Sequence, residues 1–294
     1  MCAALDACAL PTSCDPNSGL CTIGPAPKVW QGNYDITDAA SVAALAGFTA
    51  IDGSLFVTKS TTIASVTLPD LQRISGFLYV EGSKVTDLAL PGLASVGQYV
   101  YFDNNLALAS VGLGKLVSVC EYIHVDHALS LVDLDLGALQ ITGDSASFYR
   151  AGSPVLDLSS LHTVGGDLAF YHTTLTTLKI DSLATVDGFL YLDHNASLEN
   201  LGPSPLTSVG GYFYADANTK LASFTLPSLS TVGDYMYVTN NGLKSLGLPK
   251  LATVDGYGYF ANNAALPACS VAMLTAMFAG PVTNSGNNGV GPCD

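Results

Sequence analysis

Charged residues are scarce in this sequence. Asp, Glu, Lys and Arg make up 12% of its 294 residues, and Arg73 and Arg150 are its two arginines. Long apolar runs are also lacking, because the longest, residues 271–279, is far shorter than the ~20 residues that a membrane-spanning helix needs. The chain is nevertheless 49% apolar. We therefore expect a soluble protein with no membrane span and enough apolar side chains to bury a core.

Positive charge is the scarcest kind, since 10 Lys and Arg stand against 24 Asp and Glu and give a net charge of -14. This charge repels phosphate backbones and anionic lipid surfaces, so we expect no nucleic-acid partner. No local motif indicates a nucleophile with its base, a carboxylate pair in a groove, or a positive cluster for uronate sugars. We predict that the protein is not an enzyme and needs no cofactor, and a polysaccharide-active enzyme is the least favoured function.

The seven cysteines are unevenly placed. Four lie near the N-terminus and two near the C-terminus, while one stands alone: Cys2, Cys8, Cys14 and Cys21; Cys269 and Cys293; Cys120. Their spacing contains no C-x2-C pair and so disfavours zinc. Terminal clusters predict disulfides and an oxidising compartment, hence a secreted or cell-surface protein whose signal peptide has been removed. We expect a Cys269–Cys293 bond and a Cys120 thiol, and the pairing of the first four stays open.

A repeat of 22 or 23 residues dominates the chain. A β-branched residue marks each period: Ile51, Ile74, Val96, Val119, Ile141, Val164, Val186, Val209, Val232 and Val254. A large apolar residue precedes each of these anchors by three positions, except that Leu139 is displaced by one in the fifth period. Glycine and then alternating apolar residues follow, as in residues 186–192. We predict an all-β fold, a right-handed parallel β-solenoid of about ten coils with short helical caps.

The segments outside the repeat predict the ends of the rod. Residues 1–27 are expected to form a Cys-rich extension, residues 28–50 an N-terminal cap, residues 51–265 the solenoid, and residues 266–294 a C-terminal cap closed by the disulfide. Residues 30–36 look like a degenerate extra coil. Asp38 to Ala46 predicts a short helix that begins at an Asp38 N-cap and stops at Gly47. Ser270 to Phe278 predicts the second capping helix.

The coil motif resembles a known family. Leu-Pro-x-Leu-x-x-Val-x-Gly-x-Leu-x-Val-x-x-Asn, with its leucine column and Asn turn, is similar to the repeat of the receptor L-domain family, in particular to secreted bacterial leucine-rich-repeat-like proteins. The similarity covers roughly residues 28–294. It implies a binding or surface-structural module without catalytic residues. The sequence departs from the family in one respect, because its outer strand positions have tyrosine where the relatives have small polar residues.

These outward positions form the candidate ligand-binding site. Strand alternation places a row of aromatic residues on one face: Phe56, Phe77, Tyr79, Tyr99, Tyr101, Tyr122, Phe189, Tyr191, Tyr212, Tyr214, Tyr235, Tyr237, Tyr257 and Tyr259. Ser145, Ser147, Asp167 and Ala169 interrupt the row, and we expect a shallow dip there. Stacked tyrosines can simply stabilise a sheet, yet a continuous aromatic strip in water favours an interaction surface.

Two further columns flank the aromatic row. An acidic column consists of Glu81, Asp103, Asp126, Asp193 and Asp216, which suits either a solubilising edge or the orientation of a partner. His127, His172 and His194 share one turn position, and His172, Asp193 and His194 are weak candidates for a metal site. The turn asparagines predict a side-chain amide ladder.

The function that these patterns favour is a non-catalytic, extracellular or cell-surface binding module. Its ligand is expected to be a glycan or a protein, bound at the tyrosine-rich face. A structural protein that self-associates through the same face is the alternative, and the sequence does not choose between these ligands.

Overall fold

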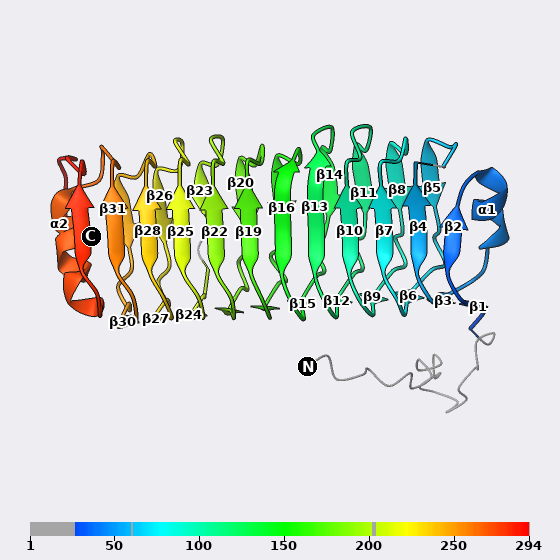
Figure 1. Ribbon diagram of the computed structural model, residues 1–294, viewed down its shortest axis with the longest axis horizontal. Coiled ribbons are helices and arrows are strands. Elements are labelled where there is room, and N and C mark those ends of the chain that lie inside the picture. The colour runs from blue at the N-terminus through cyan, green and yellow to red at the C-terminus, as the bar shows by residue number, and fades with distance from the viewer. Residues whose placement is uncertain (1–26, 60, 202–203, 294) are drawn as a thin grey trace, which may run out of the picture.

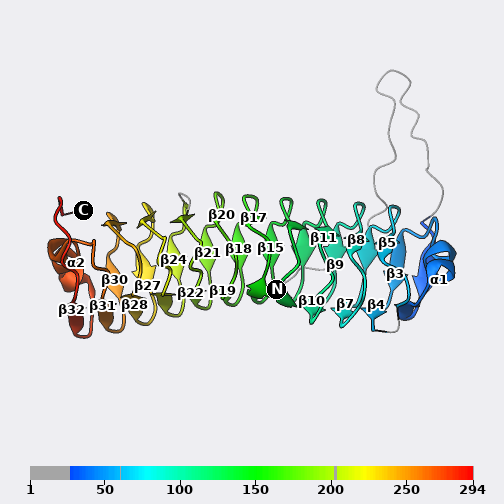
Figure 2. The same cartoon turned by 90° about the horizontal axis from the view of Figure 1, so that it is seen from above.

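A computed structural model describes residues 27–59, 61–201 and 204–293, and shows an all-β parallel solenoid of about eleven turns, here called coils. The coils lie side by side along one long axis, with helix α1 (Ala39–Ala44) at one end and α2 (Ala268–Leu274) at the other (Figure 1). Seen along a perpendicular direction, the row of coils keeps the same order (Figure 2). The predicted extension of residues 1–27 lies outside the described residues apart from its last one.

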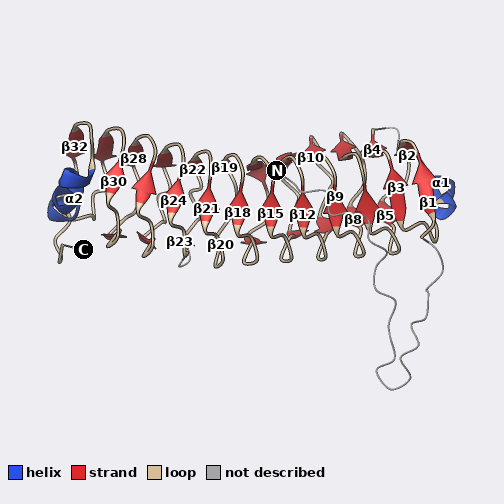
Figure 3. Cartoon of the chain, turned by 90° about the horizontal axis from the view of Figure 1, so that it is seen from below, coloured by secondary structure: helices blue, strands red, loops and turns tan. Residues whose placement is uncertain are grey.

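Strands line the sides of every coil and loops form the corners (Figure 3). Sheet I has eleven strands: β1 (Val29–Gln31), β3 (Ala50–Asp52), β6 (Arg73–Ile74), β9 (Ser95–Val96), β12 (Ser118–Val119), β15 (Ile141–Thr142), β18 (Thr163–Val164), β21 (Thr185–Val186), β24 (Ser208–Val209), β27 (Thr231–Val232) and β30 (Thr253–Val254). Sheet II has twelve: β2 (Tyr34–Ile36), β4 (Leu55–Thr58), β7 (Leu78–Glu81), β10 (Val100–Asp103), β13 (Ile123–Ala128), β16 (Ala146–Ala151), β19 (Leu168–Tyr171), β22 (Leu190–Asp193), β25 (Phe213–Asp216), β28 (Met236–Thr239), β31 (Gly258–Ala261) and β32 (Val282–Ser285). Each complete coil thus contributes one strand to sheet I and one strand to sheet II.

The third side of the rod is divided into two sheets. Sheet IIIa consists of β5 (Ser65–Thr67), β8 (Asp87–Ala89), β11 (Ser110–Gly112) and β14 (Asp133–Asp135). Sheet IIIb consists of β17 (Val155–Asp157), β20 (Thr177–Lys179), β23 (Asn200–Leu201), β26 (Ser223–Thr225) and β29 (Ser245–Gly247). Pro154 explains the division. Thr176 N–H donates to Pro154 O and Val132 N–H donates to Ala109 O, but Pro154 has no N–H to donate to the coil before it.

The core fills the inside of the rod. Inward strand residues and the leucine column are buried, and the pairing is parallel and in register, as where Val100 lies between Leu78 and Ile123. The glycine of the motif is required by close packing of coils at one corner. A Cβ on Gly143 would lie 2.0 Å from Cys120 O. The predicted repeat and its buried leucine column are therefore confirmed, with one coil more than the ten counted from the anchors, since β1 and β2 complete the degenerate first coil.

The anchor predicted for the fifth coil was wrong by one residue. Thr142, not Ile141, lies opposite Val119 and Val164. Thr142 is fully buried, whereas Ile141 is 38% exposed. Leu139 then precedes its anchor by three positions like its equivalents. The register imposed by the two neighbouring coils outweighs the preference for burying isoleucine over threonine. Among the described residues, Thr142 Oγ1 is the one buried side-chain oxygen or nitrogen with no hydrogen-bond partner.

The two caps are close to those predicted. Asp38 is the N-cap of α1, where its side chain accepts from Ser41 N–H and the Ser41 hydroxyl accepts from Asp38 N–H. At the other end α2 begins at Ala268 and continues into the 3-10 helix η1 (Thr275–Met277). No described helix has the length and apolarity needed to cross a membrane.

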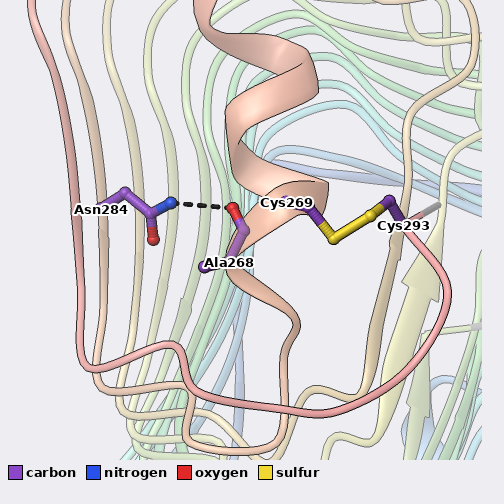
Figure 4. The surroundings of a disulfide bond; sticks show 4 residues. All are labelled: Ala268, Cys269, Asn284 and Cys293. Atoms are coloured by element: carbon purple, nitrogen blue, oxygen red, sulfur yellow. Dashed lines mark hydrogen bonds between the residues drawn. A yellow bond between two sulfur atoms is a disulfide. The ribbon is translucent and has the colours of Figure 1, made fainter.

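The predicted Cys269–Cys293 disulfide is present and fixes the C-terminal segment to α2 (Figure 4). In the same view the Asn284 side chain donates to Ala268 O at 2.9 Å. The Cys120 thiol stays a prediction, because the four N-terminal cysteines lie outside the described residues.

Candidate functional site

Sheet II presents three outward columns, each with one residue per coil. Column 1 precedes the strands and contains Phe77, Tyr99, Tyr122, Ser145, Asp167, Phe189, Tyr212, Tyr235 and Tyr257. Column 2 occupies the second strand position and contains Phe56, Tyr79, Tyr101, His124, Ser147, Ala169, Tyr191, Tyr214, Tyr237 and Tyr259. Column 3 occupies the fourth position and contains Glu81, Asp103, Asp126, Tyr149, Tyr171, Asp193 and Asp216. The predicted aromatic and acidic residues are therefore on one face, which we call the aromatic face.

The aromatic rings stack on one another along the rod. In column 1 the Tyr99 and Tyr122 rings are 4.8 Å apart between centroids and 2° from parallel, and the Tyr212 and Tyr235 rings are 4.7 Å apart and 6° from parallel. Column 2 repeats this arrangement, with Tyr214 and Tyr237 at 4.7 Å and 3°. Parallel rings this close must lie face to face with an offset. Both faces of an interior ring are thus covered by its neighbours, and ring edges and hydroxyls point to solvent.

This stacking changes what the aromatic face offers to a ligand. Its aromatic residues are half-buried except Tyr257, which is 43% exposed. Much of the apolar area that the sequence suggested would lie in water is therefore buried against the next coil. A sugar that stacks on a ring face would find such faces covered within each stack, whereas a partner that contacts ring edges and hydroxyls would find a regular array.

The acidic column orients some of these hydroxyls. Tyr79 Oη donates to Glu81 at 2.8 Å, and Tyr191 Oη donates to Asp193 at 3.0 Å. The hydrogen bond to Glu81 raises the pKa of Tyr79 to about 12. Burial between neighbouring rings raises the pKa of Tyr212 to about 12. Both phenols stay protonated near neutral pH. The Tyr79 hydroxyl donates its one proton to Glu81, whereas the Tyr212 hydroxyl can donate to a ligand.

The dip expected in the middle of the row is filled. Tyr149 and Tyr171 take the place of acidic residues in column 3, and their ring centroids are 5.8 Å apart. The Tyr149 ring also lies 5.7 Å from the His124 ring. Ala169, an outward residue, is only 1% exposed. Sequence reasoning left both tyrosines out of the site, although their position four residues after column 1 was a readable signal.

A corner column follows column 3 directly. Its residues adopt left-handed backbone conformations, with φ between 46° and 57°: Asn104, His127, Arg150, His172, His194, Ala217, Asn240 and Asn262. The three predicted histidines thus share one corner, as expected. The His172 and His194 rings are 4.6 Å apart. His172 is nevertheless not part of either cluster of metal-ligand atoms among the described residues, which are Asp103 with Asp126 and His127, and Asp193 with His194 and Asp216.

The predicted asparagine ladder runs inside this corner. The Asn218 side chain accepts from Asn195 N–H at 3.0 Å and donates to Leu192 O at 3.0 Å, and Asn241 and Asn263 repeat the pattern toward the C-terminus. These amides are buried and satisfy backbone groups of the preceding coils. Their role is to hold the corner that presents columns 2 and 3.

Comparison with known proteins brings no relative to the chain: no family model, no curated protein and no solved structure matches it. The structure itself shows that the protein belongs to the class of β-solenoid repeat proteins. The more specific resemblance to receptor L-domains rests on the sequence motif alone.

Proposed function

We propose that the protein is a non-catalytic binding module and that the aromatic face docks a second protein with basic residues at the edge of its contact surface. The observation that carries the proposal is the stacked array of half-buried tyrosines, whose interior rings have both faces covered by their neighbours. Tyrosine combines a large contact area with few rotatable bonds and is enriched where interfaces derive most of their binding energy.

The size of the aromatic face is suited to a protein interface. From the coil of Phe77 to that of Tyr257 sheet II makes eight inter-strand steps, or ~38 Å at ~4.8 Å a step. Four residues separate columns 1 and 3, which adds a width of ~13 Å at ~3.3 Å per residue. The projected area is then roughly 500 Å2, and about twice that counted over both partners, which is near the lower limit for a specific interface.

Charge selects the partner class. Column 3 places Glu81, Asp103 and Asp126 beside one block of stacked tyrosines, and Asp193 and Asp216 beside the other. Basic residues on a partner would be attracted to both stretches, whereas two copies of a chain with net charge -14 repel each other. The covered ring faces disfavour stacking with sugars. A basic protein partner therefore agrees with these features better than a glycan or a second copy does.

The proposal includes the place where the protein works. The Cys269–Cys293 bond is suited to an oxidising compartment, so we propose a secreted or cell-surface protein. The resemblance to receptor L-domains, whose members bind ligands, supports the same class of function without naming the ligand.

The test begins with a photo-crosslinking amino acid at Tyr257, the most exposed ring. A protein captured from the native extracellular material is identified by mass spectrometry, purified, and titrated against three forms of the chain. The first form is the parent, and the second replaces Tyr212, Tyr214, Tyr235 and Tyr237 with Thr, which keeps strand propensity. We expect the dissociation constant to rise at least tenfold in the second form and to rise with salt in the parent.

The third form is a matched control with four exposed apolar side chains replaced by Thr on other sides of the rod: Val117, Val132, Ile141 and Val155. It should bind like the parent. Equal binding by the parent and the tyrosine variant would refute the proposal. A signal on a glycan array that is lost only in the tyrosine variant would show that the ligand is a glycan and not a basic protein. Concentration-dependent association in light scattering, lost in the same way, would show that the ligand is a second copy of the chain.

A further inference from the structure

The corner beside column 3 brings metal-ligating atoms together twice. One cluster joins Asp193 and His194 of one coil to Asp216 of the next, and their ligand atoms lie within 4.8 Å of one another. The other joins Asp103 to Asp126 and His127, and its ligand atoms also lie within 4.8 Å of one another. Each cluster offers two carboxylates and one imidazole nitrogen, a ligand set that divalent transition ions accept.

The Asp193 cluster has unbalanced charge in a shielded place. The Asp193 side chain is 7% exposed. Neither Asp193 nor Asp216 forms an ion pair with lysine or arginine among the described residues, and the charged contact of Asp193 is to His194 Nδ1 at 2.6 Å. Two carboxylates on adjacent coils, one of them buried, repel each other unless a cation lies between them.

Neighbouring side chains hold these carboxylates in place. Tyr191 Oη donates to Asp193 Oδ2, while Thr239 Oγ1 and Asn240 Nδ2 donate to Asp216 Oδ1. Donors of this kind fix the orientation of ligating carboxylates in metal sites and leave their other lone pairs available. The outward ring nitrogen of His194, Nε2, has no protein hydrogen bond among the described residues.

The second cluster differs in one residue, an arginine that contacts its histidine. Arg150 Nη1 donates to His127 Nε2. That bond requires the proton of a neutral His127 to be on Nδ1, which lies 2.9 Å from Asp126 and 3.7 Å from Asp103. A protonated Nδ1 cannot ligate a metal. The guanidinium therefore keeps the proton on the ligand atom of His127. His194 Nδ1 also faces a carboxylate, but its Nε2 has no such donor among the described residues and can take the proton when Nδ1 ligates a metal.

We infer that Asp193, His194 and Asp216 form a binding site for one divalent transition-metal ion, of which Zn2+ is the test case. His194 Nδ1 and one oxygen from each carboxylate would be its protein ligands, and water would complete the coordination. An imidazole ligand favours Zn2+ over Ca2+ and Mg2+, which prefer oxygen alone. The ion would clamp two successive coils beside the tyrosines of column 2.

The experiment is isothermal titration of the untagged protein with ZnCl2, together with thermal unfolding with and without Zn2+. We expect one Zn2+ per chain and a higher unfolding temperature in its presence. His194→Asn should weaken binding at least tenfold without unfolding the chain, because Asn occupies the same left-handed position at Asn104, Asn240 and Asn262. Asp216→Asn should weaken it as well, and Asp103→Asn, the matched control, should not.

Arg150→Asn tests the comparison between the clusters. It removes the guanidinium and frees His127 to ligate through Nδ1, so we expect the stoichiometry to rise from one Zn2+ to two. No binding of Zn2+ at millimolar concentration by the folded parent would overturn the inference. Binding that is unchanged in both His194→Asn and Asp216→Asn, or Ca2+ binding as tight as Zn2+ binding, would overturn it too.

Discussion

Replacing Thr142 with valine should stabilise the protein. The Thr142 hydroxyl is fully buried with no hydrogen-bond partner, and a buried unsatisfied polar group of this kind costs about 1–3 kcal/mol. Valine has nearly the same shape, and the equivalent positions in the adjacent coils are Val119 and Val164, both buried. We expect the free energy of unfolding to increase by ~1–3 kcal/mol.

The measurement is the midpoint of urea denaturation, monitored by circular dichroism. A gain of 1 kcal/mol corresponds to a rise of about 2 °C in unfolding temperature for a chain of 294 residues. The matched control is Thr231→Val, an exposed threonine on sheet I, which should change stability by less than about 0.5 kcal/mol. If Thr142→Val is no more stable than the parent, the hydroxyl is satisfied in solution and our reading of that coil fails.

Two further predictions concern the corner and the third side of the rod. Asn218→Ala should lower the free energy of unfolding by about 2–5 kcal/mol, because Asn195 N–H and Leu192 O lose their partners inside the core. Asn200→Ala, at an exposed position, is its control. The hydrogen bond from Lys179 lowers the pKa of Asp157 from 3.8 to about 2. The stability that this carboxylate contributes is therefore complete above about pH 4 and is lost as the pH falls toward 2. A carboxyl NMR titration should find that low pKa, and Lys179→Gln should move it back toward 3.8.

Most of the fold was predictable because the repeat expresses a local rule. An apolar residue every second position, a glycine at the tight corner and a leucine three residues before each anchor determine which side chains turn inward. The rule fails at Ile141 and Thr142, where hydrophobicity and register disagree. The register prevails because a coil shifted by one residue would lose its backbone hydrogen bonds with both neighbouring coils. The division of the third side could also be inferred from the sequence. Pro154 lacks an N–H at a position where the equivalent residues of the adjacent coils, Val132 and Thr176, donate a backbone hydrogen bond.

The candidate site was predictable in position but not in character. Strand alternation assigns Tyr212 and Tyr235 to one face, yet it does not tell whether their rings lie flat on the sheet or stand on edge. Stacking is set by the ~4.8 Å spacing of the strands, which forces rings in one column into parallel offset contact. The relation of Asp193 to Asp216 likewise required the structure, because the ladder, not the sequence, brings residues 23 apart to within ligand distance.

The interrupted third side has a mechanical consequence. The ladder hydrogen bonds of a solenoid run along its axis, so a force that pulls the two ends apart passes through every junction between coils in series. Such a rod separates first at the junction that is held by the fewest hydrogen bonds. Between the coil of β5 and the coil of β29 every junction is joined on all three sides except the one between β14 and β17, where only sheets I and II join the coils. Under tension the body of the rod between β5 and β29 should part first there, near Pro154, leaving two shorter rods, each with one block of stacked tyrosines intact.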